Sequence, residues 1–232
     1  GVVFQDPTAS LDPTMPIGRQ IEEPLRVHTR MSARARRQRV AELFERTGLS
    51  GIDRIAGRYP HELSGGQRQR VMLSIALACE PELIIADEPT TALDVTVQAE
   101  ILELFRELRR DLGISALFVS HDLAVVGEIA DRVAVMYGGR IVESGPTAEV
   151  LQHPKHAYSR ALLSCVPRLG AGRGVLQVID PGLLVQPTDD DPAQPGAQCT
   201  PSTGPLLIGA VLEPGASLQA ETESLPDPDR EA

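Results

Sequence analysis

Two adjacent carboxylates stand directly after a short apolar run in this chain. The run covers residues 83–86, and the acids are Asp87 and Glu88. Such a run predicts a buried parallel strand, and open α/β sheets place their ligands at the carboxyl ends of these strands. There, one carboxylate could hold a divalent cation while the other activates water. The sequence therefore predicts an active site at this edge of a sheet.

A second candidate site is the Ser64-Gly65-Gly66-Gln67 stretch upstream of the acids. Ser64 supplies a hydroxyl, and the two glycines supply unhindered backbone amides at the start of a predicted helix that runs to Cys79. Helix N-termini of this composition bind anions such as phosphate. Taken alone, the stretch is more often a plain helix-capping turn than an anion site.

Gln5 ends one further predicted strand, and His121 follows another. The carboxyl ends of parallel strands meet at one edge of a sheet, so we expect both side chains near Asp87 and Glu88. Phosphoanhydride hydrolysis needs a Mg²⁺ ligand, a base or positioner for water, and donors toward the transferred group. These four residue types match those needs, although each alone is also compatible with an ordinary loop position.

Hydrophobic periodicity predicts the elements that must position these residues. An alternation of strand and helix from residue 82 onward indicates an α/β fold, and Gly138-Gly139 indicates a hairpin turn. The predicted helices cover residues 17–27, 32–47, 64–79, 94–112, 123–130, 147–152 and 156–163, with Asp94 or Thr96 as the cap of the fourth. The predicted strands cover residues 2–5, 83–86, 115–119, 132–137 and 140–143.

Charge and cysteine content restrict the class of protein. The net charge is -10, but residues 1–165 hold 22 acidic and 19 basic side chains, so most of the excess lies in the Pro/Gly-rich tail at 168–232. The body shows no overall basic character, and composition gives no argument for nucleic-acid binding. The three cysteines lack the spacing of a zinc or disulfide framework. No apolar run has the length of a membrane span.

The first half of the second predicted helix, residues 32–47, contains a group of arginines. It comprises Arg34, Arg36, Arg37 and Arg39. Such a group is typical of a solvated helix face, with contact to a partner or to lipid headgroups as the alternative.

The order and spacing of these motifs over residues 1–165 resemble the nucleotide-binding subunits of ATP-binding-cassette (ABC) transporters. The resemblance implies that Gln5 is the Q-loop glutamine, a catalytic residue and Mg²⁺ ligand. Asp87 and Glu88 match the Walker B acids, with Asp87 serving Mg²⁺ and Glu88 acting as general base. His121 matches the switch histidine. ATP and Mg²⁺ are the implied cofactors, and ATP hydrolysis is the implied activity.

The resemblance also implies a partner-facing half-site. In the family two cassettes associate head to tail, and the signature loop of one covers ATP held by the other. The positions of this chain that match are Leu63, Ser64, Gly65, Gly66 and Gln67 of the signature loop, and Asp94 of the D-loop. A second cassette subunit is therefore an expected partner, as a homodimer or a heterodimer.

The implied architecture is a partial P-loop NTPase-type ABC ATPase core with an inserted helical subdomain and a mostly disordered tail. We expect a core strand at residues 1–5, the helical signature subdomain at 6–80, and the rest of the core at 81–145. The start of a C-terminal extension is expected at 146–167 and the disordered tail at 168–232, with a marginal strand near 206–212.

Two motifs narrow the resemblance to the dipeptide/oligopeptide and nickel importer branch. They are the stretch from Val3 to Ile21 and the His153-Pro154-Lys155-His156 run with the residues after it. The branch implies transmembrane permease subunits as partners, an extracytoplasmic solute-binding protein as an indirect one, and a peripheral position at the cytoplasmic face of the inner membrane. Di- or oligopeptides are the expected cargo, and nickel or another small solute is the alternative.

The sequence contains no phosphate loop of the form G-x-x-x-x-G-K-[ST], and Lys155 is its only lysine. We therefore expect an N-terminally truncated fragment without Walker A, inactive by itself. The remaining alternatives are a non-transport ABC protein of DNA repair or translation and a truncated, non-catalytic cassette.

Overall fold

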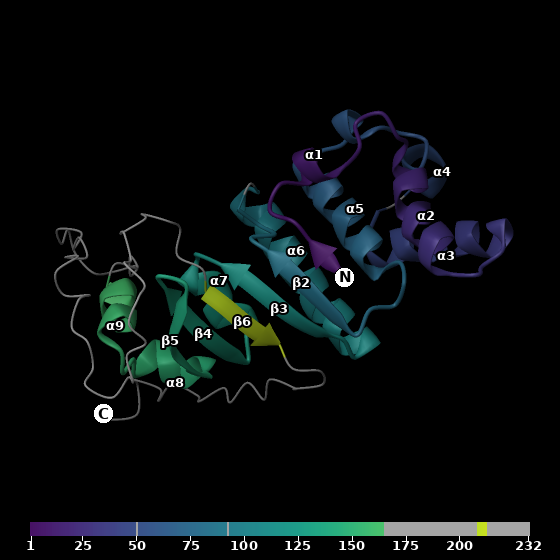
Figure 1. Ribbon diagram of the computed structural model, residues 1–232. Helices are drawn as coiled ribbons and strands as arrows, with labels where there is room; N and C mark the ends of the chain where they lie inside the picture. The colour runs from purple at the N-terminus through teal and green to yellow at the C-terminus, as the bar shows by residue number, and fades with distance from the viewer. Residues whose placement is uncertain (50, 92, 165–207, 213–232) are drawn as a thin grey trace, which may run out of the picture.

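One six-stranded sheet organises the part of the chain that the computed structural model describes, namely residues 1–49, 51–91, 93–164 and 208–212 (Figure 1). Strands β1, β2 and β3 pair in parallel, so their carboxyl ends share one edge. In spatial order the strands are β1 (Val2–Val3), β2 (Leu83–Asp87), β3 (Ser115–Ser120), β6 (Ile208–Leu212), β4 (Arg132–Tyr137) and β5 (Arg140–Pro146).

The segment between β1 and β2 is helical throughout its described elements, and it lies at one end of the sheet (Figure 1). The elements are α1 (Pro7–Ser10), α2 (Ile17–His28), α3 (Ala33–Arg46), α4 (Ile52–Ile55), the 3-10 turn η1 (Pro60–Glu62) and α5 (Gly65–Leu77). The short helices α1 and α4 lie outside the helices that the sequence predicts. In α1, Asp6 accepts a hydrogen bond from the Thr8 amide at 2.7 Å, and Pro7 suits the first helical position.

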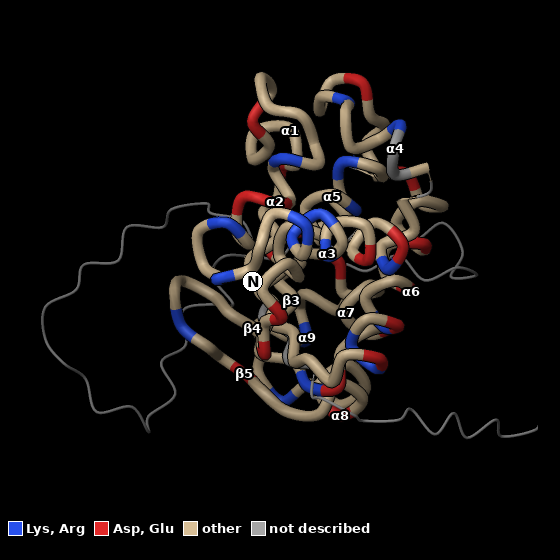
Figure 2. Tube along the Cα trace, turned by 90° about the vertical axis from the view of Figure 1, so that its right-hand side faces the viewer, with Lys and Arg blue, Asp and Glu red and all other residues tan. Residues whose placement is uncertain are grey.

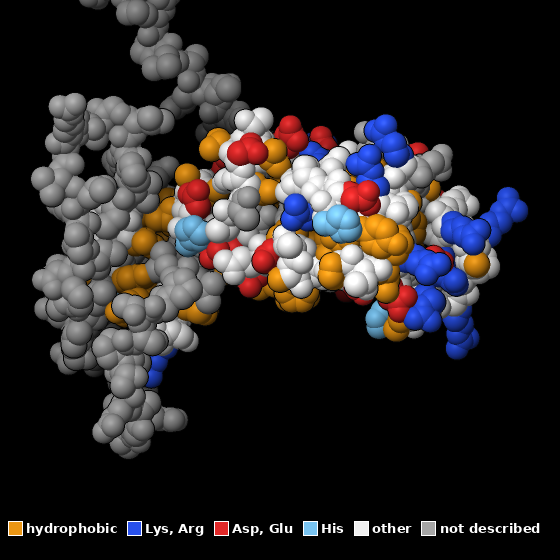
Figure 3. All heavy atoms as spheres, turned by 90° about the horizontal axis from the view of Figure 1, so that it is seen from above, with side chains coloured by type: hydrophobic (Ala, Val, Ile, Leu, Met, Phe, Trp, Pro, Cys, Tyr) orange, Lys and Arg blue, Asp and Glu red, His pale blue; other side chains and the backbone are white. Residues whose placement is uncertain are grey.

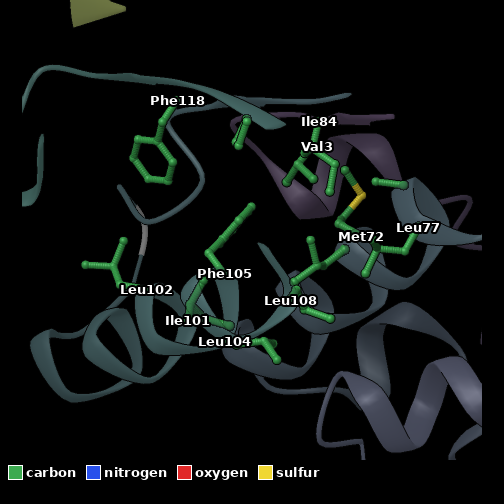
Figure 4. Packing of buried hydrophobic residues seen from close by; sticks show 14 of the residues in the cluster. Val3, Met72, Leu77, Ile84, Ile101, Leu102, Leu104, Phe105, Leu108 and Phe118 are labelled. Carbon is green, nitrogen blue, oxygen red and sulfur yellow. The ribbon is translucent and has the colours of Figure 1, made fainter. Parts of the chain in front are cut away.

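The part of the core that positions the site lies between the sheet and two helices, α5 and α6 (Val95–Leu112). Figure 4 shows sheet residues such as Val3 and Ile84 facing side chains of both helices. Phe105 of α6 meets Phe118 of β3 edge to face, with ring centroids 5.8 Å apart. This packing fixes α5, and with it the 64–67 loop, relative to the strand ends.

The second face of β2 is more exposed than the sequence predicts. Ile84 and Ala86 are fully buried, whereas Leu83 and Ile85 are 45% and 36% exposed. Successive strand residues point to opposite faces, and α5 and α6 cover only one of them. Within the described part of the chain, the predicted buried strand is therefore buried on one face only.

Strand β6 lies between β3 and β4 and is antiparallel to both (Figure 1). Helix α7 (Leu123–Ile129) connects β3 to β4 along the chain. These two strands are not neighbours in the sheet, because β6 lies between them. The expected strand near residues 206–212 is thus present at 208–212. The expected disorder of the tail concerns residues that otherwise lie outside the described ranges.

Helices α8 (Thr147–Gln152) and α9 (Ala157–Ser164) follow the β4–β5 hairpin. Glu143 of β5 accepts hydrogen bonds from the Lys155 and His156 amides, at 2.7 and 3.1 Å. The Tyr137 and Tyr158 rings lie 4.4 Å apart between centroids. These contacts hold the start of the C-terminal extension against the hairpin.

The arginine group of α3 is divided between paired and exposed side chains. Arg36 pairs with Glu22 at 2.8 Å and Arg39 with Glu80 at 3.2 Å, whereas Arg34 and Arg37 are exposed. Figure 2 shows both signs of charge along the helices, and Figure 3 shows basic side chains gathered at the end of the molecule where α3 lies. None of the described helices combines the length and the apolar character that crossing a bilayer requires.

Candidate active site

Three strand ends bring their polar residues together around Glu88. The Gln5 amide nitrogen donates to Glu88 Oε2 at 2.7 Å, and His121 Nδ1 lies 2.9 Å from Oε1. The Thr91 hydroxyl also donates to Oε2, at 3.0 Å. Glu88 itself is only 7% exposed. The structure thus joins Gln5, Glu88 and His121 as the sequence predicts, and it adds Thr91, which the sequence analysis missed.

The backbone of Glu88 adopts a left-handed conformation, with φ +44°. Residues with a Cβ avoid this region, and such strain persists where surrounding contacts enforce it. Here the Glu88 amide donates to the Val119 carbonyl of β3 at 2.9 Å, while the side chain makes its three contacts. The strained residue therefore turns the carboxylate inward between the strand ends.

The Glu88 carboxyl group has a lowered pKa. Burial alone would raise this pKa, but the hydrogen bonds with His121, Thr91 and Gln5, together with attraction to His121, outweigh burial. Glu88 is consequently ionised at neutral pH. An ionised carboxylate only accepts hydrogen bonds, so the proton of this contact resides on His121 Nδ1. This leaves Nε2 of the half-exposed His121 side chain for another partner.

Asp87 is the last residue of β2, pairs in register with Val119 and is half-buried. The described residues contain no group of three or more acidic, His or Cys side chains arranged to hold a metal. Mg²⁺ needs no such group, since it commonly uses one or two carboxylates with water and substrate phosphate. Gln5 bonds Glu88 through its nitrogen, so its oxygen can serve as a further ligand. This donor chemistry fits Mg²⁺.

The 64–67 loop forms a capping box at the start of α5. Ser64 Oγ accepts from the Gln67 amide at 3.3 Å, and Gln67 Oε1 accepts from the Ser64 amide at 3.0 Å. Gly65 and Gly66 begin the helix, where amides have no intrahelical acceptor. The two glycine amides and the helix dipole remain suited to an anion.

Leu63 and Asp94 flank this loop in different ways. The Leu63 side chain is 4% exposed and belongs to the core, so it anchors the loop. Asp94 caps α6 by accepting from the Val97 amide at 3.0 Å, which decides between the two caps that the sequence allows. Among the described residues, no hydrogen bond joins the 64–67 loop directly to the group around Glu88. The chain therefore carries two distinct candidate sites.

Two protein-family models match this chain. The model described as ABC transporter matches residues 1–91, which contain Gln5, the 64–67 loop and Glu88. A second model, described as oligopeptide/dipeptide transporter, C-terminal region, matches residues 142–189. The chain belongs to the ABC transporter family. The predicted family and branch are thereby confirmed.

Two curated relatives are similar to most of this ABC protein but are longer than the part they share with it. A Brucella ovis protein named "Putative peptide import ATP-binding protein" is 57% identical over 170 residues, which are 73% of this chain and 50% of the relative. A Brucella melitensis protein, also named "Putative peptide import ATP-binding protein", is 49% identical over 191 residues, which are 82% of this chain and 57% of the relative. The chain spans about half the length of the curated relatives it matches.

Two solved structures share the fold. The cbiO1 protein of Clostridium perfringens, part of the ABC transporter complex cbiONQ, aligns with a TM-score of 0.59 at 33% identity, covering 66% of this chain and 59% of its own. The ATP-binding cassette MJ0796, in a dimeric post-hydrolysis state with ADP and Pi, aligns with a TM-score of 0.55 at 32% identity, covering 63% and 62%. The predicted ABC ATPase fold is confirmed.

Proposed function

We propose that the chain is part of an ATP-hydrolysing subunit that powers import of di- or oligopeptides. The observation that carries the proposal is the buried, ionised Glu88 at a strand end, held between Gln5, Thr91 and His121. The peptide-import names of the relatives and the match at residues 142–189 support the cargo class.

In the proposed reaction, water attacks the γ-phosphorus of ATP, and the bond to the β–γ bridging oxygen breaks to give ADP and phosphate. Glu88 orients the water and accepts its proton. His121 donates its Nδ1 proton in the hydrogen bond to Glu88, and in the imidazolium form its Nε2–H would also donate to the γ-phosphate. Asp87 and the Gln5 oxygen would hold Mg²⁺, which neutralises charge on the β- and γ-phosphates when bound.

The 64–67 loop would act on a different nucleotide, one held by a second cassette in a head-to-tail dimer. The amides of Gly65 and Gly66 at the start of α5 supply donors for its phosphate. We further propose permease subunits as membrane partners, a solute-binding protein as an indirect partner, and a peripheral position at the cytoplasmic face of the inner membrane. The words peptide import in the relative's name support a role in a membrane transport system.

The 232 residues contain no G-x-x-x-x-G-K-[ST] motif, so we expect the purified chain to show no ATP turnover by itself. Turnover by this chain that Glu88→Gln abolishes would overturn that expectation.

A chimera tests the catalytic assignment. It joins the part of the Brucella ovis relative that precedes the matched region to residues 1–232, which is reasonable at 57% identity. We expect Mg²⁺-dependent ATPase activity, reduced about 100-fold or more by Glu88→Gln if Glu88 is the base. The matched control is Glu82→Gln, which changes an exposed glutamate beside the same strand and should preserve activity. A near-normal rate for Glu88→Gln would remove Glu88 from this role.

Uptake measurements test the cargo. The chimera would be expressed in a bacterial strain that lacks the ATPase of its own peptide importer, and uptake of a radiolabelled tripeptide and of nickel would be compared. Restored peptide uptake that Glu88→Gln abolishes supports the proposal. Restored nickel uptake without peptide uptake would replace peptide with nickel as the cargo.

A further inference from the structure

The first turn of α5 packs against the start of α6 without room for a side chain at Gly66. A Cβ built on Gly66 would lie 2.6 Å from Val97 Cγ1, far inside van der Waals contact. At the neighbouring Gly65 a Cβ would lie 3.5 Å from Leu93 Cδ2, an ordinary contact. Gly66 is therefore required here for packing, separately from any use of its amide.

Val97 cannot easily move away from Gly66. Val97 is half-buried against the core, and valine in a helix is largely restricted to one χ1 rotamer. A second contact holds the same two helices together, because Arg70 of α5 pairs with Glu100 of α6 at 3.0 Å. Arg70 also donates to the Thr47 carbonyl at 2.9 Å, which fixes its guanidinium. The start of α5 and the start of α6 are therefore in contact at Gly66 and linked again through Arg70.

A short series of hydrogen bonds continues from Val97 to the active-site carboxylate. They are Val97 N to Asp94 Oδ1 at 3.0 Å, Leu93 N to the Thr90 carbonyl at 3.2 Å, Thr91 N to the Glu88 carbonyl at 3.3 Å, and Thr91 Oγ1 to Glu88 Oε2 at 3.0 Å. The turn formed by residues 88–91 is thus connected to the 64–67 loop through the start of α6.

We propose that the contact between Gly66 and Val97 couples the two sites of one chain. A phosphate that binds the 64–67 loop displaces the first turn of α5, and Val97 transmits this displacement to the 88–91 turn and the Glu88 carboxylate. Gly66 is then a positioning residue for Glu88. The identity of the two ligands rests on the proposed function, whereas the contact itself can be tested without nucleotide.

The test is a size exchange between the two positions in the 232-residue chain. Gly66→Ala overfills the contact, and Val97→Ala leaves a gap. In the double variant the two Cβ atoms would lie 3.9 Å apart, an ordinary methyl contact that restores the packing. Gly65→Ala is the matched control, since its Cβ meets only Leu93 Cδ2 at 3.5 Å.

The readouts are the NMR signals of the Thr91 amide and the His121 ring, together with amide exchange in the 88–91 turn. We expect each single variant to shift these signals and to accelerate exchange at least about fivefold, which corresponds to about 1 kcal/mol of packing. The double variant should return toward wild type, and Gly65→Ala should resemble wild type. Loss of stability alone would not move the His121 signals of the folded chain.

Two results would overturn the coupling. One is unchanged Thr91 and His121 signals in Val97→Ala, a variant that removes atoms and is expected to fold. The other is additive effects in the double variant, with no recovery. An inactive chimera would contradict the proposed ATPase function and leave these measurements untouched, so the two failures are distinguishable.

Discussion

The left-handed backbone of Glu88 predicts an unusual order of stability for two substitutions. Glu88→Ala and Glu88→Gly both remove the contacts to Gln5, Thr91 and His121, but only alanine keeps the strain of φ +44°. A Cβ in this region costs about 1–2 kcal/mol. Glycine's greater freedom in the unfolded chain offsets about 0.5–1 kcal/mol of the relief. We therefore expect Glu88→Gly to be the more stable variant, by about 0.5–1 kcal/mol.

Urea unfolding followed by far-UV circular dichroism measures this difference, with the midpoint and slope compared between the two variants. Glu80 has φ +51° and provides a repeat outside the site, where glycine should again exceed alanine. Thr91 has no positive φ, so it provides the opposite control. At Thr91 we expect alanine to exceed glycine by about 0.4–1 kcal/mol.

A more stable Glu88→Ala than Glu88→Gly would refute the reasoning, provided that the Glu80 pair behaves as expected. It would mean that the 88–91 turn relaxes once the side-chain contacts are lost, and that the strain is not imposed by the backbone contact with Val119.

Two further predictions concern carboxylates. The lowered pKa of Glu88 means that its stabilising effect is fully present above the unfolded pKa of about 4.3 and is lost as pH falls through the lower folded value. The stability difference between wild type and Glu88→Gln should therefore shrink as pH falls below about 4.3 in urea titrations, and a constant difference would contradict this assignment. Glu143→Gln leaves one of the Lys155 and His156 amides without an acceptor, so it should cost about 1–3 kcal/mol and speed their exchange. Glu149→Gln breaks only an exposed pair with the Lys155 ammonium and should cost under about 1 kcal/mol; equal losses would refute the anchoring role of Glu143.

The sequence by itself determined which strand ends carry the polar residues and that Ser64 caps α5. Apolar runs that stop at Asp87, at His121 and near Gln5 define the active edge, because parallel strands must present their carboxyl ends together. Ser64 identifies the start of α5 through local capping chemistry, which acts within a few residues. Features that depend on neighbours in sequence were therefore predictable.

Only the tertiary structure decided the contacts between elements that lie away from the shared edge of the parallel strands, and the backbone conformation at that edge. The close packing of Gly66 on Val97 and the left-handed backbone of Glu88 arise from contacts between segments distant in sequence. The same holds for the exposure of Leu83 and for β6 between β3 and β4. Local patterns specify periodicity and caps, whereas distances between packed elements depend on the whole arrangement. The proposed coupling to Glu88 depends on such a distance, the one between Gly66 and Val97.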